Sequence, residues 1–206
     1  MSGYAQSERR ALTDLLRDAG PDAPTLCEGW TARDLAAHLV LRERRTDAAA
    51  GIAIPPLRAY TERVQGQVRD RPWPSLVDDV RAGPPVVLRL LDEPVNLVEM
   101  FVHHEDVRRA RPGWTPRALD RGEERALWAR LGLMARLLGR RFPAGVTLVA
   151  PGFGQVRARA GEPHVTVTGP PGELVLFMSG RQRAAAVDVA GPEDVVARVK
   201  DARLGL

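Results

Sequence analysis

The sequence predicts a mainly helical α+β protein in which a helical bundle precedes a small α/β region. Three observations support this prediction. Apolar residues recur at helical spacing through most of residues 1–142, short alternating segments follow Pro143, and Gly and Pro separate the segments. The chain has 206 residues, 44% of them hydrophobic, which is enough to bury a substantial core. We therefore expect a helical domain over residues 1–142 and an α/β region over residues 143–206.

Local signals place the first two helices. Leucines at helical spacing predict a helix from about Ser7 to Ala19, which a Gly-Pro pair ends. The second helix begins after Thr31. The carboxylate of Asp34, three residues later, completes a variant of the capping box. This helix is expected to run to about Ala49.

Prolines and glycines bound the remaining helices of the first part. The sequence Gly83-Pro84-Pro85 leaves the end of the fourth helix ambiguous, whereas Pro94 opens the fifth and Pro112-Gly113 ends it. The third to sixth predicted helices span about Leu57–Arg69, Ser75–Leu91, Val95–Ala110 and Pro116–Arg141.

The region after Pro143 changes in character. Short, alternating and β-rich segments separated by Gly and Pro predict strands. A final helix starts at Pro192, since proline suits the first turn. The predicted strands are Val146–Ala150, Gln155–Ala160, His164–Thr168 and Ala186–Ala190, with a helical piece at Gly172–Ser179.

Composition excludes several classes of function. The net charge is only +4, and basic residues alternate with acidic ones without a basic stripe, so we expect no nucleic-acid partner. A single cysteine, Cys27, excludes an internal disulfide and any multi-cysteine metal site. No apolar run approaches the ~20 residues of a membrane span, and no signal peptide is evident, so we expect a cytoplasmic protein without membrane partners.

The segment most informative about chemistry is residues 99–106. Glu99 and His103 are four residues apart, so in a helix both side chains lie on one face, where they can bind one divalent metal ion. Asp106 is close to the same face and can hold the imidazole in one tautomer. His38, in another predicted helix, is a candidate third ligand, which suggests a metal site within a helical bundle.

Alternatives remain open for each of these residues. Glu99 and His103 could form an ordinary surface pair, with His38 packed at a helix interface, and the adjacent His104 could replace His103 as ligand. Asp34, four residues before His38, could either support that imidazole or only cap its helix. Cys27 could be a nucleophile but lacks a matched base, and a lone cysteine is more often a small buried residue.

Two motifs together resemble a known family. The sequence Leu-Cys-Glu-Gly-Trp-Thr-Ala-Arg-Asp-Leu-Ala-Ala-His-Leu over residues 26–39 is similar to the first metal-binding motif of the mycothiol-dependent maleylpyruvate isomerase family, which belongs to the DinB-like metal-dependent bundles. Glu99, His103 and Asp106 match that family's second motif position for position. The apolar segment 174–181, which ends in Gly-Arg, and the following residues 187–191 are similar to its C-terminal region, so the resemblance covers most of the chain.

The resemblance implies a DinB-like four-helix bundle with a small C-terminal α/β region. It implies that His38, Glu99 and His103 bind a divalent metal, usually zinc, and that the co-substrate is mycothiol, the small thiol of actinobacteria. Arg181 would match an arginine that helps to hold an anionic substrate. DinB-like bundles are often homodimers. The sequence departs from the family in its short length and in the Gly83-Pro84-Pro85 segment.

The first functional hypothesis is therefore a metal-dependent enzyme that uses mycothiol, either an isomerase or an S-transferase, acting on a small electrophile. Two His and one Glu form the ligand set of several catalytic zinc sites, in which a fourth position stays open for water or a thiol. The alternatives are a non-catalytic metal-binding or ligand-sensing module and a helical scaffold without metal. His and carboxylate ligands also suit nickel, iron or manganese.

Overall fold

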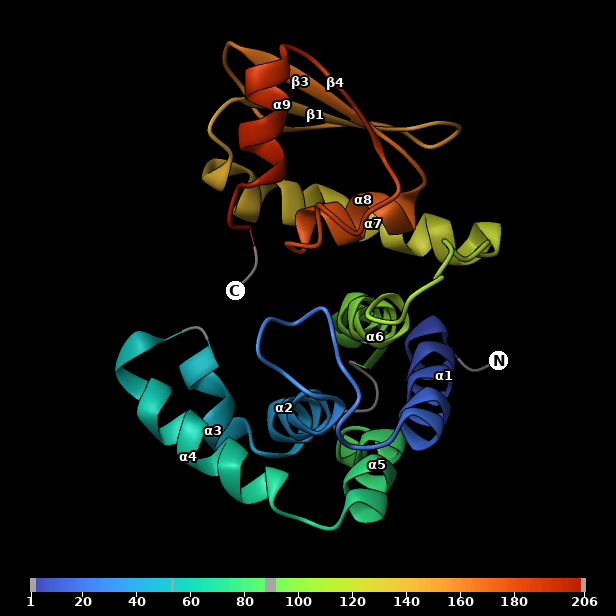
Figure 1. The fold of residues 1–206 in the computed structure, drawn as a ribbon, viewed down its shortest axis with the longest axis vertical. Helices are drawn as coiled ribbons and strands as arrows, with labels where there is room; N and C mark the ends of the chain where they lie inside the picture. Colours follow the sequence, from blue (N-terminus) through green and yellow to red (C-terminus); the bar gives the residue numbers. More distant parts are fainter. Residues whose placement is uncertain (1–2, 53, 88–91, 205–206) are drawn as a thin grey trace. The chain divides into compact units, whose positions relative to one another are not determined.

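The computed structural model describes residues 3–52, 54–87 and 92–204, and it confirms a mainly α fold with a small sheet (Figure 1). The chain forms two compact units, which divide between Thr115 and Pro116. The domain boundary expected between residues 142 and 143 stays a prediction. The sixth predicted helix, Pro116–Arg141, belongs to the second unit by its contacts.

The first unit is helical, and five of its described helices contribute to one buried core. α1 packs against α5 and α6, while α2 packs against α4 and α5. Apolar residues from α1, α2, α4, α5 and α6 form one buried cluster, in which Leu12, Leu35, Val77 and Met100 have no exposed surface. The helices of this unit are α1 Tyr4–Ala19, α2 Ala32–Arg44, α3 Thr46–Ala49, α4 Arg58–Arg69, α5 Trp73–Ala82 and α6 Asp92–Arg109, with 3₁₀ turns η1 Ala50–Ile52 and η2 Pro55–Leu57.

The predicted capping box at the start of α2 is present. The amide of Asp34 donates to the Thr31 hydroxyl, and the Thr31 amide donates to the Asp34 carboxylate over 2.9 Å. The helix then ends earlier than expected, at Arg44, because Arg45 leaves helical geometry with φ −122° and ψ 62°. The residues expected to continue it form the separate turn α3.

The fourth predicted helix is also shorter in the structure. α5 ends at Ala82, and Gly83 adopts a positive φ of 70°, a conformation that favours glycine. The ambiguity at this Gly-Pro-Pro sequence is thus resolved as a helix end, and the last part of that prediction, residues 88–91, lies outside the described residues.

The second unit combines, within its described residues, one long helix and two short ones with a four-stranded sheet. The strand order is β2-β1-β3-β4, in which β1 pairs antiparallel with β2 and parallel with β3, and β3 pairs antiparallel with β4. α7 packs on α8 and β2, and α9 packs on β3. The elements are α7 Arg121–Leu138, η4 Gly139–Arg141, β1 Gly145–Ala150, β2 Gly154–Arg159, β3 His164–Thr168, α8 Pro171–Met178, β4 Asp188–Ala190 and α9 Glu193–Lys200.

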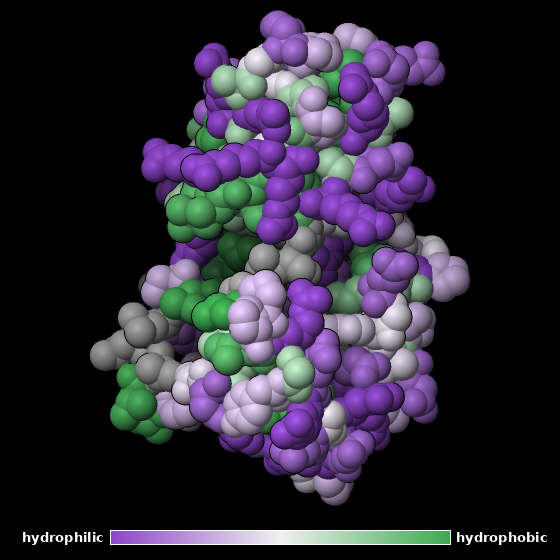
Figure 2. Space-filling model, turned by 90° about the vertical axis from the view of Figure 1, so that its left-hand side faces the viewer, coloured by the Kyte–Doolittle hydropathy of each residue, from purple (hydrophilic) through white to green (hydrophobic). Residues whose placement is uncertain are grey.

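Burial follows the expected pattern in this sheet. The central strand β1 is mostly buried, whereas the edge strand β2 is largely exposed and carries arginines, which disfavour pairing with another chain. Hydrophilic side chains cover much of the face in Figure 2, with hydrophobic side chains in patches between them. Among the described helices, none combines the length and the apolar character needed to cross a membrane.

Candidate metal centre

Two helices of the first unit bring together the three predicted ligands. His38 comes from the middle of α2, and Glu99 and His103 come from successive turns of α6. One ligand atom from each residue lies within 4.8 Å of the others. His38 and His103 are largely buried, whereas the Glu99 side chain is 25% exposed.

The interatomic distances fit a tetrahedral metal site. Nε2 of His38 and Nε2 of His103 each lie 3.3 Å from Oε1 of Glu99. Ligand atoms about 2.0–2.1 Å from a zinc ion, separated by a tetrahedral angle, are about 3.3 Å apart. The two imidazole rings meet edge to face, with centroids 5.5 Å apart. Little rearrangement is therefore needed for the three residues to hold one divalent ion.

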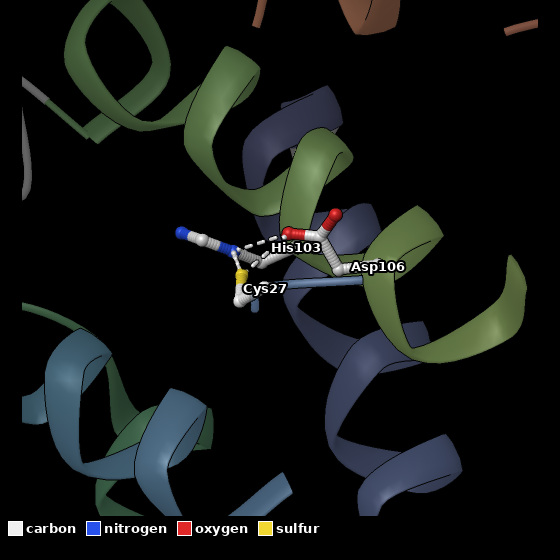
Figure 3. Close-up of side chains that lie close together, drawn as sticks. All are labelled: Cys27, His103 and Asp106. Carbon is white, nitrogen blue, oxygen red and sulfur yellow. Dashed lines mark hydrogen bonds and ion pairs between the residues drawn. The ribbon is translucent and has the colours of Figure 1, made fainter. Parts of the chain in front are cut away.

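His103 is oriented by a buried carboxylate. Nδ1 of His103 lies 2.9 Å from Oδ2 of Asp106, one turn further along α6, and Asp106 has no exposed surface. Figure 3 shows this contact and shows the other ring nitrogen pointing away from it. An ionised carboxylate only accepts hydrogen bonds, so the proton resides on Nδ1. If a metal ion displaces the second proton of the ring, Nε2 presents its lone pair on the Glu99 side of the cluster.

Cys27 approaches the same side of the His103 ring. Its thiol donates to Oδ2 of Asp106 over 3.2 Å, and its sulfur is 4.0 Å from Nδ1 of His103 (Figure 3). In a nucleophile–base–carboxylate relay, the nucleophile and the carboxylate face opposite nitrogens of the imidazole. Here both face Nδ1, so the arrangement does not match that relay. Cys27, His103 and Asp106 nevertheless form a second group whose ligand atoms are close enough for a metal ion.

The electrostatics of the cluster favour an anionic Glu99. Burial alone would raise the pKa of Glu99, but hydrogen bonds from His103 and His38 and the nearby charge of Arg42 lower it well below its ordinary value. Burial lowers the pKa of His38, despite its bond to Glu99. Burial also opposes the charged form of His103, but bonds with Asp106, Cys27 and Glu99 raise its pKa well above the ordinary value. A metal ion must therefore displace a proton from His103.

Sequence reasoning missed one residue that belongs to this cluster. Nε of Arg42 is 3.3 Å from Oε1 of Glu99, the same oxygen that both histidines contact. Its Nη1 donates to Oδ1 of Asn96 over 2.5 Å. Arg42 lies four residues after His38, so spacing could have placed it on the same face of α2 as His38, but not beside Glu99 of α6.

The structure also places the remaining predicted residues. Asp34 bonds to Thr31 and pairs with Arg69, so it caps α2, and within the described residues no bond joins it to His38. His104 does not join the cluster of His38, Glu99 and His103. Nδ1 of His104 lies 2.7 Å from the buried carboxylate of Glu8 on α1, so this ring occupies a different face of α6.

Arg181 lies in the second unit, directly after α8. Its Nη1 donates to the carbonyl of Ser179 over 2.5 Å, and its side chain is partly buried. This contact explains its local position, and its predicted role in binding an anion stays a prediction.

Comparison with known proteins agrees with these observations. Residues 5–134 match the family described as the mycothiol maleylpyruvate isomerase N-terminal domain. Two solved structures share the fold: the mycothiol-dependent maleylpyruvate isomerase, with a TM-score of 0.58, and a histidine-to-alanine mutant of that isomerase, with a TM-score of 0.60. Each is 15% identical to this chain, and the match covers 92% of this chain and 96% of the other. No curated protein sequence matches significantly. The family match spans more than half of the sequence, and we conclude that this chain belongs to the mycothiol maleylpyruvate isomerase N-terminal domain family.

Proposed function

We propose that His38, Glu99 and His103 bind one divalent metal ion, most simply Zn²⁺, and that the protein is a mycothiol-dependent enzyme. The observation that carries the proposal is the convergence of three ligand atoms within 4.8 Å, at N–O separations that a tetrahedral ion requires. The reaction class is isomerisation of, or thiol transfer to, a small electrophilic substrate. Membership of the family supports the use of mycothiol.

The protein residues have distinct tasks in this proposal. A divalent ion with an open coordination position lowers the pKa of a thiol and so supplies a nucleophile at neutral pH. Asp106 keeps the proton of His103 on Nδ1, which leaves Nε2 free as a ligand. Glu99 offsets part of the positive charge at the centre. The buried imidazole of His38, whose pKa is lowered, remains neutral and available as a ligand near pH 7.

Substrate recognition is a separate task, for which Arg181 is a proposed residue. A guanidinium group can bind a carboxylate through two parallel hydrogen bonds, as an acidic electrophile or thiol would require. Replacement of Arg181 by Gln should then raise the KM for an acidic substrate while leaving the metal content unchanged.

The first experiment measures metal content by elemental mass spectrometry after reconstitution with zinc. We expect about one equivalent in the wild type and little in His38→Ala or His103→Ala. The matched control is His164→Ala, because His164 lies in β3 and contacts Thr147. Circular dichroism confirms that each variant folds. Absence of zinc from the wild type would overturn the proposal.

A second experiment separates an enzyme from a metal-binding module. Mycothiol-dependent consumption of maleylpyruvate or another small electrophile is measured for the wild type and His38→Ala. Turnover that requires His38 supports the enzyme. Stoichiometric metal without turnover on any tested electrophile would favour the non-catalytic module.

A further inference from the structure

We propose that Arg42 recognises a carboxylate on the small molecule that occupies the open position of the metal centre. The inference rests on the metal site proposed above and adds a specificity residue to it. It assigns the bound molecule to the class of thiols or electrophiles that carry a carboxylate a few bonds from the atom at the metal.

The position of Arg42 is the first reason. It lies one helical turn after His38 on α2, and its Nε is 3.3 Å from Oε1 of Glu99. The same oxygen lies 3.3 Å from Nε2 of both histidines, so three donors converge on one atom. The guanidinium group is therefore next to the point where the ion would bind.

Charge is the second reason. Glu99 carries one negative charge, which cannot balance both a divalent cation and the guanidinium group of Arg42. The nearby carboxylate of Glu43 is not available, because Arg9 binds both of its oxygens, over 2.7 and 2.8 Å. A metal ion on Oε1 of Glu99 would compete with Arg42 for that oxygen, and the other hydrogen-bond partner of the guanidinium group among the described residues is the neutral amide of Asn96. A carboxylate on the bound molecule would give Arg42 an anionic partner of its own.

The orientation of the guanidinium group is the third reason. Its Nη1 donates to the buried side chain of Asn96, whose Nδ2 donates to Asp92 over 2.7 Å. The hydrogen bond to Asn96 holds the Arg42 side chain in place and occupies Nη1, at one edge of the guanidinium group. Nε and Nη2 form another edge with parallel N–H bonds, the geometry that a carboxylate binds in a bidentate manner. Within the described part of the chain, Nη2 makes no hydrogen bond, and the Arg42 side chain is 24% exposed.

The test uses cobalt-substituted protein and two thiols of equal length. 3-Mercaptopropionate carries a carboxylate, and 3-mercapto-1-propanol is its neutral counterpart. Each thiol releases its proton to the buffer as its sulfur binds cobalt, and the sulfur-to-cobalt absorption band reports the dissociation constant. Arg42→Gln removes the charge, Arg42→Lys retains it, and Arg44→Gln is the control on the same helix, where Arg44 pairs with Asp79.

We expect the wild type and Arg44→Gln to bind the acidic thiol about tenfold more tightly than the neutral one, as one charged hydrogen-bonded contact provides. Arg42→Gln should bind cobalt normally and lose this preference, and Arg42→Lys should keep part of it.

Other outcomes overturn the inference in distinguishable ways. Equal affinity for the two thiols in the wild type would refute anion recognition while leaving the metal site intact. If Arg42→Gln instead loses cobalt, Arg42 positions Glu99 and does not select the ligand. Loss of the preference in Arg181→Gln but not in Arg42→Gln would assign the role to Arg181. If the wild type does not bind cobalt, the proposed metal site itself fails.

Discussion

Nδ1 of His103 donates to Oδ2 of Asp106 over 2.9 Å, within a single turn of α6. This bond fixes which ring nitrogen faces Glu99. The Asp106 carboxylate also strengthens His103 as a donor to a metal, because a nearby negative charge increases the basicity of the ring. In the proposed metal centre, Asp106 would therefore act through His103 without contacting the ion.

Asp106→Asn should therefore weaken zinc binding by about 10- to 100-fold without abolishing it. The amide oxygen can still accept from Nδ1, so the ring keeps its orientation but loses the influence of the charge. Competition with a chromophoric chelator measures the affinity. An unchanged affinity would show that His103 does not use Nε2 as a ligand in the way proposed.

Cys27 provides a test between the two candidate metal groups. Its sulfur lies on the Nδ1 side of His103, away from His38 and Glu99. Cys27→Ala should thus retain one equivalent of zinc, and Cys27→Ser should bind it equally well. Loss of the metal in both variants, with folding intact, would move the site to Cys27, His103 and Asp106.

The adjacent residues His103 and His104 are expected to have different roles, the first in metal binding and the second in stability. His104→Ala removes a hydrogen bond of 2.7 Å between the imidazole and the buried carboxylate of Glu8, and the loss of a bond to a charged group should destabilise the protein by about 1.5–3 kcal/mol. Metal content should be unaffected, in contrast to His103→Ala. Urea denaturation and elemental analysis of both variants provide the comparison. Loss of metal in His104→Ala alone would reverse the assignment of these two histidines.

The features that the sequence predicted best are contacts between residues close to one another in the chain. The pairing of Glu99 with His103, the contact of Asp106 and the Thr31–Asp34 cap all follow from spacings of three or four residues, which helical geometry converts directly into contacts. The position of His38 beside them depends on packing between helices. Its residue type in a second predicted helix made it a candidate ligand, and the resemblance to a family supported that choice.

Other features could not be predicted because they depend on tertiary structure. Arg42 shares a helix face with His38, but its contact with Glu99 exists only because α2 and α6 approach each other. Cys27 lies in the loop before α2, and nothing in its own sequence context indicates Asp106 as a partner. The end of α5 depends on whether Gly83 takes a positive φ, which a Gly-Pro-Pro sequence permits but does not require.

The helix cap at Asp34 predicts a specific dependence of stability on pH. Burial tends to raise the pKa of Asp34, but hydrogen bonds from Thr31 and the charges of Arg69 and Arg33 lower it below the ordinary value. A lowered pKa in the folded state means that the ionised carboxylate adds stability above its unfolded pKa. This contribution is lost as the pH falls through the folded pKa.

Asp34→Asn should cost about 1 kcal/mol at pH 7 and little below about pH 3. Urea titrations of both proteins at pH 7, 5 and 3 measure the difference, and a difference that grows toward low pH would contradict this role.

The buried network around Arg9 should be the most sensitive part of the first unit. Arg9 has no exposed surface, and its guanidinium group binds Glu43 through two bonds and Asp92 over 2.7 Å. Burial raises the pKa of Glu43 despite these bonds. Arg9→Met leaves that carboxylate buried without its hydrogen-bonded counter-charge, so we expect a loss of about 3–5 kcal/mol in the free energy of unfolding.

The double variant Arg9→Met/Glu43→Met tests the cause of this loss. Removal of both charges replaces the central ion pair with apolar contacts, so the double variant should be more stable than Arg9→Met alone. The reference is Arg17→Met on the same helix, whose partners Asp14 and Asp78 are exposed and which should change stability by less than about 1 kcal/mol. Urea denaturation of the wild type, Arg9→Met, Glu43→Met, the double variant and Arg17→Met provides the values. If the double variant loses as much as the sum of the single variants, the penalty arises from packing rather than from an uncompensated charge.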